Sequence, residues 1–330
     1  MSEREGDVHV ETYSMADAKL RLDAFEDLLR ASGLEIKRGS DLERLALGVI
    51  DLHEKHLRPE LQDGSADIRA WMRETVGFNQ LVALILAVKD TARFEQLVPH
   101  LHLLNAATTT QNAWAPCTDA ASNKLFELVL ACAAIRAGFG VELDHPERST
   151  GRNPDVLVDV GEARPFGVAC KTLHSNKPRT MLDNIEKGAS QIEASPASRG
   201  IVALNLKNLF PHDDFFPILN VHEWAQGEEP QYAAWKSKDV LLEHTNLAAD
   251  TVIGPLTGET EVDELQRILH QYPKVLPGVL FYVHTAAGVT VNGSPLPTNF
   301  GFLKLKLMDG PLDEADMTVL QRMNDGMQIA

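Results

Sequence analysis

The chain has 330 residues, of which 44% are hydrophobic and 24% are charged, as in ordinary globular proteins. This length accommodates one large domain or two ordinary ones, each with its own core. The formal net charge of −16 argues against a protein that coats nucleic acid through bulk electrostatic attraction. The longest apolar run, at residues 81–88, is far shorter than the roughly 20 residues that a membrane-spanning helix needs.

The cysteines and the first residues of the chain indicate the cellular compartment of the protein. Cys117, Cys132 and Cys170 show neither a metal-binding spacing nor an even-numbered disulfide framework, which favours a reducing environment. Residues 1–11 are polar and acidic and lack the apolar segment of a secretion signal. These features predict a cytoplasmic protein without a membrane partner.

The first third of the chain has the apolar periodicity of helices. Helices are predicted at residues 15–30, 41–56, 66–76 and 79–89. Residues 105–117 are polar and without periodicity, which is typical of a linker. We therefore predict an all-helical N-terminal domain at residues 1–117, whose helices offer a surface to a protein partner, and a second domain at residues 118–330.

The pattern after residue 117 is that of an α/β domain. A helix is predicted at residues 119–137, and two strands at 155–160 and 166–173 are expected to form a hairpin. A helix at 180–194 and a strand at 200–206 follow. The rest of the chain adds a helix near 262–271 and strands near 279–284 and 300–307. A helix, a hairpin, a helix and a strand in this order indicate an α/β fold.

Glu127 places a carboxylate inside the otherwise apolar helix predicted at residues 119–137. Such a group is costly to bury unless it is paired or binds a metal ion. Two interpretations stay open on the sequence alone. The side chain either reaches solvent or pairs with a core arginine, or it serves as a metal ligand.

The predicted hairpin carries a second acid and a lysine. Strand alternation places Asp155 on the face that also carries Leu157 and Asp159. Lys171 lies inside a strand of otherwise apolar and small residues. It is expected either to form a structural ion pair with Asp155 or to contact phosphate and water.

The helix predicted after the hairpin has one polar face. Asn184, Lys187 and Gln191 recur on it at i, i+3 and i+7. A polar face of this kind is normally just solvated. This face is a candidate for a functional role only because its helix follows the hairpin directly.

In the order of these features the chain resembles the catalytic core of the PD-(D/E)xK nuclease superfamily. The match consists of a helix with Glu127, the dipeptide Pro154-Asp155, a strand ending near Lys171, and a helix with Gln191. It spans residues 123–209, about a quarter of the chain, and implies a restriction-endonuclease-like mixed sheet flanked by helices.

The resemblance also implies residue roles. Glu127 and Asp155 are expected to bind Mg²⁺ or Mn²⁺, and Lys171 is expected to orient or activate the attacking water and stabilise developing charge. Gln191 is expected to orient the substrate or the site.

One position departs from the superfamily's motif. Ala169 stands where the (D/E)xK acid is expected, and its methyl group cannot bind a metal ion. Either another acid serves, with Asp159, Glu162 and Glu186 as candidates, or the site has lost activity and only binds. The presence of Glu127, Asp155 and Lys171 favours retained activity, with one metal ion rather than two.

The charge of the central segment allows contact with a nucleic-acid backbone. Residues 118–209 contain eleven Lys or Arg and eleven Asp or Glu, so this segment is neutral and the net charge lies outside it. Lys177, Arg179 and Lys187 follow the second strand of the hairpin and are expected to form a phosphate-binding rim, or else an ordinary solvated surface.

The function implied by the resemblance is Mg²⁺- or Mn²⁺-dependent hydrolysis of nucleic-acid phosphodiester bonds, of DNA more than of RNA. Restriction, phage defence, toxin and repair settings all suit such an enzyme. The alternative is a catalytically inactive nuclease-like domain that binds nucleic acid or protein. Ala169 favours this alternative.

Overall fold

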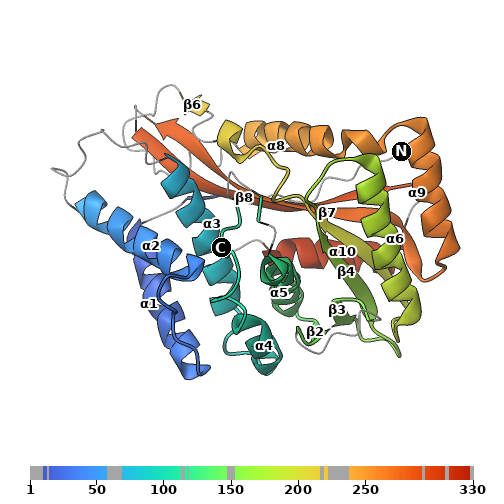
Figure 1. The fold of residues 1–330 in the computed structure, drawn as a ribbon, viewed down its shortest axis with the longest axis horizontal. Helices are drawn as coiled ribbons and strands as arrows, with labels where there is room; N and C mark the ends of the chain where they lie inside the picture. Colours follow the sequence, from blue (N-terminus) through green and yellow to red (C-terminus); the bar gives the residue numbers. More distant parts are fainter. Residues whose placement is uncertain are drawn as a thin grey trace.

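The computed structural model describes residues 10–12, 15–57, 69–112, 116–117, 119–146, 153–215, 219–221, 238–291, 294–308 and 312–327. Within them the protein is an α/β structure built on one eight-stranded mixed sheet, with helices on both of its faces (Figure 1).

The helices come in two groups along the chain. Before the central strands lie α1 (Met15–Ala31), α2 (Asp41–Leu57), α3 (Arg69–Leu86), the 3-10 helix η2 (Phe94–Leu97), α4 (Val98–Leu101) and α5 (Ala120–Arg136). Among and after the strands lie α6 (Pro178–Ala194), η3 (His212–Phe215), α8 (Lys238–Ile253), η4 (Gly254–Leu256), α9 (Glu259–Gln271) and α10 (Glu314–Met327).

The strands are β1 (Val10–Thr12), β2 (Gly140–Leu143), β3 (Val156–Asp159), β4 (Phe166–Thr172), β5 (Arg199–Asn205), β6 (Leu219–Val221), β7 (Val275–Val291) and β8 (Ser294–Leu307). The sheet runs in the order β1-β8-β7-β5-β4-β3-β2, and β6 pairs with β7 beside this path. β2, β3 and β4 form an antiparallel meander, whereas β4, β5 and β7 pair in parallel. The parallel step from β4 to β5 needs a crossover connection, which α6 supplies.

The two faces of the sheet bury separate hydrophobic clusters. On one face α3, α5 and α10 cover a cluster that includes Val168 and Cys170 of β4. On the other face α6 and α9 cover a cluster that includes Ala169 and Leu173. Because successive strand residues point to opposite faces, Lys171 belongs to the face that α6 covers.

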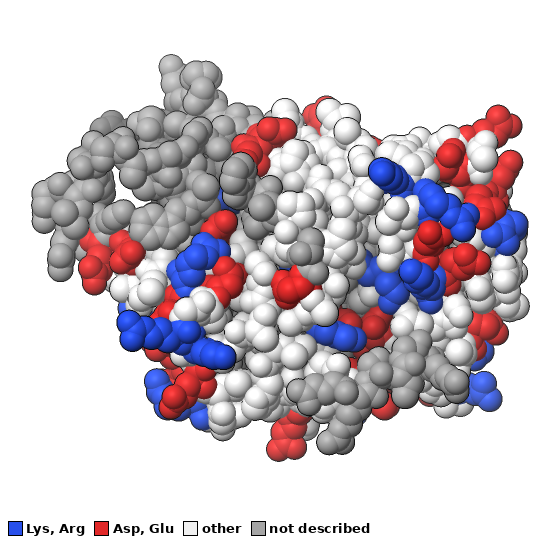
Figure 2. All heavy atoms as spheres, viewed as in Figure 1, with Lys and Arg blue, Asp and Glu red and all other residues white. Residues whose placement is uncertain are grey.

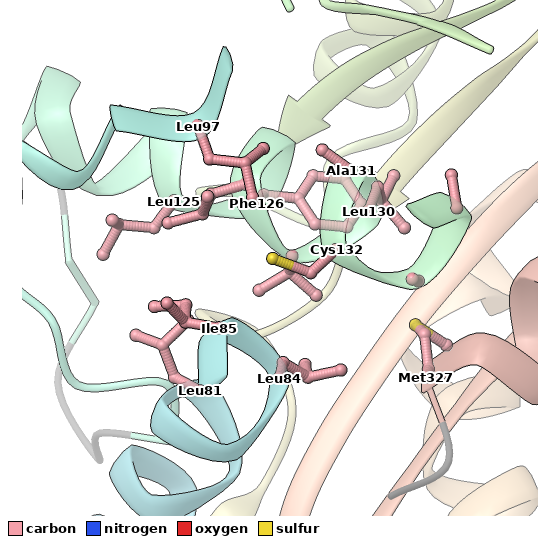
Figure 3. Close-up of a cluster of buried hydrophobic side chains, with 14 of the residues drawn as sticks. Leu81, Leu84, Ile85, Leu97, Leu125, Phe126, Leu130, Ala131, Cys132 and Met327 are labelled. Carbon is pink, nitrogen blue, oxygen red and sulfur yellow. The ribbon is translucent and has the colours of Figure 1, made fainter. Parts of the chain in front are cut away.

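α5 is buried on nearly all sides, which explains its apolar sequence. The Asp119 carboxylate caps its N-terminus by accepting from the Ser122 backbone N–H at 2.7 Å, and Gly138, with a φ of 84°, follows its C-terminus. Figure 3 shows Leu81 and Ile85 of α3 facing the α5 side chains, with Met327 of α10 nearby. This packing holds α5 firmly beside β3 and β4.

Most of the predicted elements around the candidate site are confirmed. The bounds of α5, β4, α6 and β5 lie within two residues of the predicted ones, as do those of α1 and α2. β3 begins at Val156, one residue later than predicted. β1, β2, β6, α8 and α10 were not predicted, and β7 and β8 are longer than the strands predicted there.

The prediction of two helices at 66–76 and 79–89 was wrong. The described part of this segment is a single helix, α3, that continues through Gly77; residues 66–68 lie outside the described residues. A Cβ at Gly77 would lie 2.5 Å from Asn112 Oδ1, so the glycine accommodates a neighbouring segment rather than ending the helix.

The polar segment predicted to link two domains contains buried residues. Thr109 to Asn112 are at most 5% exposed. The Asp41 carboxylate accepts at 3.0 Å from both the backbone N–H and the hydroxyl of Thr110. These bonds satisfy the backbone N–H and the hydroxyl of Thr110 inside the protein. The division at residue 117 stays a prediction, and α3, which precedes it, packs against α5 and β7.

Gly188 allows α6 to approach the sheet closely beneath the candidate site. A Cβ at this position would lie 2.9 Å from Val202 Cγ1 and 3.3 Å from Ala169 Cβ, both fully buried residues. For Gly188→Ala, overpacking of about 1–3 kcal/mol should exceed the gain of about 1 kcal/mol in helix propensity. We expect a lower free energy of unfolding in chemical denaturation.

Gly254→Ala is the matched control, because a Cβ there has nothing within 4 Å. Its free energy of unfolding is expected to stay within about 1 kcal/mol of the parent value. Equal stability of the two variants would contradict a tight contact between α6 and the sheet.

Candidate active site

Glu127, Asp155 and Lys171 meet near the C-terminal end of β4. Glu127 lies in the middle of α5, Asp155 directly precedes β3, and Lys171 is the last residue but one of β4. Glu127 is 3% exposed and Asp155 is 5% exposed, whereas the Lys171 side chain is 16% exposed. The structure therefore brings together three residues that the sequence pattern selected over a span of 45 positions.

Asp155 is fixed to β4 by its side chain. Its Oδ2 accepts from the backbone N–H of Cys170 at 2.6 Å and from Lys171 Nζ at 3.2 Å. Lys171 Nζ also donates to the Cys170 carbonyl at 3.0 Å. The carboxylate thus occupies a position where the antiparallel ladder between β3 and β4 would otherwise continue, which is why β3 begins only at Val156.

Glu127 is neither solvated nor paired with an arginine, so the structural interpretation of this residue was wrong in its details. Its Oε1 is 2.7 Å from Lys124 Nζ, and its Oε2 is 3.2 Å from His100 Nε2. Lys124 lies one turn earlier on the same helix and His100 belongs to α4. Lys124 Nζ is also 3.7 Å from Asp155 Oδ1, so its ammonium lies between the two carboxylates.

The electrostatics of this cluster follow from its burial. Burial and the nearby carboxylate of Asp155 raise the pKa of Glu127 well above its usual value. Burial, helped by Lys124, lowers the pKa of His100 to about 4, which leaves the imidazole neutral at pH 7. For Lys124, burial acts to lower the pKa, but Glu127 and Asp155 outweigh it and raise the pKa. Two acids are thus held close together by two lysines.

A cavity of about 530 Å³ opens beside Lys171. Lys171 lines it together with Glu186, Lys187, Ser190 and Gln191 of α6, and Tyr272 after α9. Two further residues selected from the sequence, Lys187 and Gln191, therefore share a cavity with Lys171. The Gln191 Oε1 atom is buried without a hydrogen-bond partner, so this amide is not locked into the protein's own hydrogen bonds through its oxygen.

The three basic residues of the predicted phosphate rim differ in whether they form ion pairs. Arg179 is ion-paired at 2.9 Å with Asp183, one turn later on α6. Lys177 and Lys187 are exposed, and within the described part of the chain neither makes an ion pair. Figure 2 shows basic side chains, with acidic ones between them, over the part of this face where Figure 1 places α6 and α9.

The position of Ala169 is closed to an acid. Ala169 is fully buried in the cluster under α6, close to Gly188. Of the three acids that could replace it, Glu162 is ion-paired with Arg199 at 2.6 Å, and Asp159 is exposed at the opposite end of β3 from Asp155. Glu186 alone among these three lines the cavity with Lys171.

The described residues contain no group of three or more His, Cys, Asp or Glu side chains that could by itself hold a metal ion. Glu127 and Asp155 nevertheless suit a single divalent cation. Their charges are close enough for Asp155 to raise the pKa of Glu127, and a bridging cation would relieve this repulsion. Mg²⁺ takes oxygen ligands and retains several waters, so two carboxylates and a substrate phosphate suffice for one ion.

Sequence reasoning missed two members of this cluster. Lys124 was detectable, because residues three apart on a helix are neighbours and Lys124 precedes Glu127 by three positions. His100 was not, since no local pattern links it to a helix that begins 20 residues later.

None of the helices in the described ranges is long and apolar enough to cross a membrane. Comparisons of the chain with models of protein families, with curated proteins and with solved structures gave no match.

Proposed function

We propose that the protein is a nuclease that uses one Mg²⁺ or Mn²⁺ ion to hydrolyse phosphodiester bonds in nucleic acid, with DNA favoured over RNA. The observation that carries the proposal is the cluster of Glu127, Asp155 and Lys171, from three separate elements, of which Lys171 also lines a cavity together with Lys187 and Gln191. The order of α5, β2 to β4, α6 and β5 supports a restriction-endonuclease-like core.

The roles of the chain's own residues follow from their positions. Glu127 and Asp155 would supply the carboxylate oxygens for the metal ion. Lys171 presents its ammonium at the cavity, where it stabilises negative charge that develops on the phosphate. Gln191 and Lys187 line the same cavity from α6, where they would hold the substrate backbone. The bound ion would polarise the phosphoryl oxygen and lower the pKa of a water molecule.

Glu186 is proposed as the acid that replaces the one missing at position 169. It projects from α6 into the cavity that Lys171 borders, whereas Asp159 and Glu162 lie at the other end of the hairpin. In this position its carboxylate would be available to accept a proton during the reaction.

A catalytically inactive, nucleic-acid-binding module is the second candidate, because two observations favour it. Lys124 already neutralises Glu127 and Asp155 within the chain, and the position of the missing acid is filled by packed apolar residues. A binding module would use the same exposed lysines without cleaving its ligand.

The test is a cleavage assay on plasmid, single-stranded DNA and RNA with Mg²⁺, with Mn²⁺ and with EDTA. We expect cleavage that EDTA abolishes and that Asp155→Asn eliminates, whereas Asp159→Asn keeps it. Asp159 is the matched control because it is a carboxylate of the same hairpin, exposed and remote from Lys171. Glu186→Gln is expected to lower the rate by roughly 10–100-fold.

Two outcomes would count against the proposal. Equal cleavage by Asp155→Asn and the parent protein would place the activity elsewhere. A parent protein that cleaves none of the substrates but binds one of them would establish the inactive module instead.

A further inference from the structure

Lys124 occupies the space between the two acids of the candidate site. Its Nζ is 2.7 Å from Glu127 Oε1 and 3.7 Å from Asp155 Oδ1, and its side chain is 21% exposed. An ammonium group that contacts one oxygen of each of two carboxylates takes the position that a bridging metal ion would take. Lys124 also lies one turn from Glu127 on a buried helix, which fixes the origin of its side chain.

The remaining carboxylate oxygens have partners that cannot leave easily. Glu127 Oε2 faces His100, which is 1% exposed. Asp155 Oδ2 accepts from the Cys170 backbone and from Lys171. Oε1 and Oδ1 instead share one flexible and partly exposed partner, Lys124, whereas Oδ2 keeps its bond to the Cys170 backbone even if the Lys171 side chain, which is 16% exposed, moves. A cation that binds both acids must therefore replace the Lys124 ammonium.

We propose that Lys124 is an internal counter-cation of this site, and that a divalent metal ion binds to Glu127 and Asp155 only as the Lys124 ammonium leaves them. The inference rests on the proposed function for the identity of the metal site. It adds that the free protein is held in a closed, charge-balanced state with low metal affinity.

Binding of Mn²⁺, followed by the electron paramagnetic resonance signal of the free ion, tests this without any nucleic acid. Lys124→Met removes the charge but keeps the length of the side chain, and it is expected to bind Mn²⁺ about tenfold more tightly than the parent. Lys124→Arg keeps the charge and should bind as weakly as the parent. Adding Glu127→Gln to Lys124→Met should abolish the gain, which locates the ion at these acids.

A second measurement uses the parent protein, so that the result does not depend on how the variants fold. Acetylation of lysines by acetic anhydride, read by peptide mass spectrometry, reports how free each ammonium is. Saturating Mn²⁺ is expected to increase the modification of Lys124 several-fold relative to that of Lys187, which is exposed and contacts neither acid.

The inference is overturned if Lys124→Met binds Mn²⁺ no more tightly than the parent, or if Mn²⁺ leaves the acetylation of Lys124 unchanged. Its outcome is separate from that of the nuclease proposal. Tighter binding by Lys124→Met in a protein that cleaves nothing would support the counter-cation and refute the nuclease. Cleavage by the parent protein, together with equal Mn²⁺ affinities of Lys124→Met and the parent, would support the nuclease and refute the counter-cation.

Discussion

Replacing Lys171 with methionine is expected to lower the rate of nucleic-acid cleavage by roughly 10²–10³-fold while Mn²⁺ binding is retained. The Lys171 ammonium lies 3.2 Å from Asp155 Oδ2, and Lys171 lines the cavity, so the proposed role of this side chain is to stabilise charge that appears on the phosphate during the reaction. Its interaction with the substrate strengthens as that charge develops, and such interactions lower the barrier rather than tighten ground-state binding.

The design separates a role in chemistry from a role in binding. Lys187→Met is the matched control, since Lys187 lines the same cavity from α6 without contacting Asp155. It is expected to weaken substrate binding with little change in the rate at saturation. Single-turnover rates and affinities measured for both variants provide the comparison.

Two results would contradict the role given to Lys171. A rate loss matched by an equal loss of Mn²⁺ affinity would mean that the lysine only holds Asp155 in place. An unchanged rate at saturating substrate would mean that the charge on the phosphate is stabilised by another group.

The central α/β elements could be predicted because local sequence determines them. α5 is apolar along most of its length, with an aspartate before its first turn and a glycine two residues after its end. β4 and β5 consist of apolar and small residues at 166–170 and 200–204, because both of their faces are covered by helices. Patterns of this kind identify an element without knowledge of its neighbours.

Other elements depend on contacts that the sequence does not display. β2 has only four residues, Gly140 to Leu143, and exists as the edge partner of β3. α3 continues through Gly77 because Asn112, 35 positions away, packs against the glycine. The buried polar stretch from Thr109 to Asn112 looks like a linker until its tertiary hydrogen bonds are known.

Some residues of the candidate site could likewise be predicted from the sequence, and others could not. Glu127, Asp155 and Lys171 were identified from their positions on predicted elements, and the fold brings them together. The choice of Glu186 over Asp159 and Glu162 required the cavity, since all three are acids near the hairpin in sequence. The partners of Glu127 required the distances, because His100 reaches it from another helix.

Two buried histidines, His212 and His284, are together expected to contribute about 4 kcal/mol to the loss of stability when the pH is lowered from 7 to 5. His284 lies in β7 and is 3% exposed, and His212 lies in η3, 3.0 Å from the hydroxyl of Thr285 in β7, and is 2% exposed. Burial lowers the pKa of His212 to about 3 and that of His284 to about 4. In the unfolded chain both titrate near the usual value of about 6.5.

The sign follows from which state takes up protons. Between pH 6.5 and the depressed pKa values the unfolded chain binds protons that the folded protein excludes, so acid favours unfolding. A pH of 5 lies about 1.5 units below the unfolded-state pKa of each histidine. This difference corresponds to a loss of about 2 kcal/mol in the free energy of unfolding for each of them. The full stabilisation is present above pH 6.5 and is lost progressively as the pH falls towards 4 and then 3.

The variant His284→Leu tests the contribution of one of these histidines to the pH dependence of stability. Neither ring nitrogen of His284 has a hydrogen-bond partner in the described structure, so leucine removes a titrating group without breaking a bond. Urea denaturation at pH 7 and pH 5 is expected to show a pH-dependent loss about 2 kcal/mol smaller than in the parent. His102→Leu, at an exposed position, should leave that loss unchanged, and an equal loss in His284→Leu and the parent would refute the assignment.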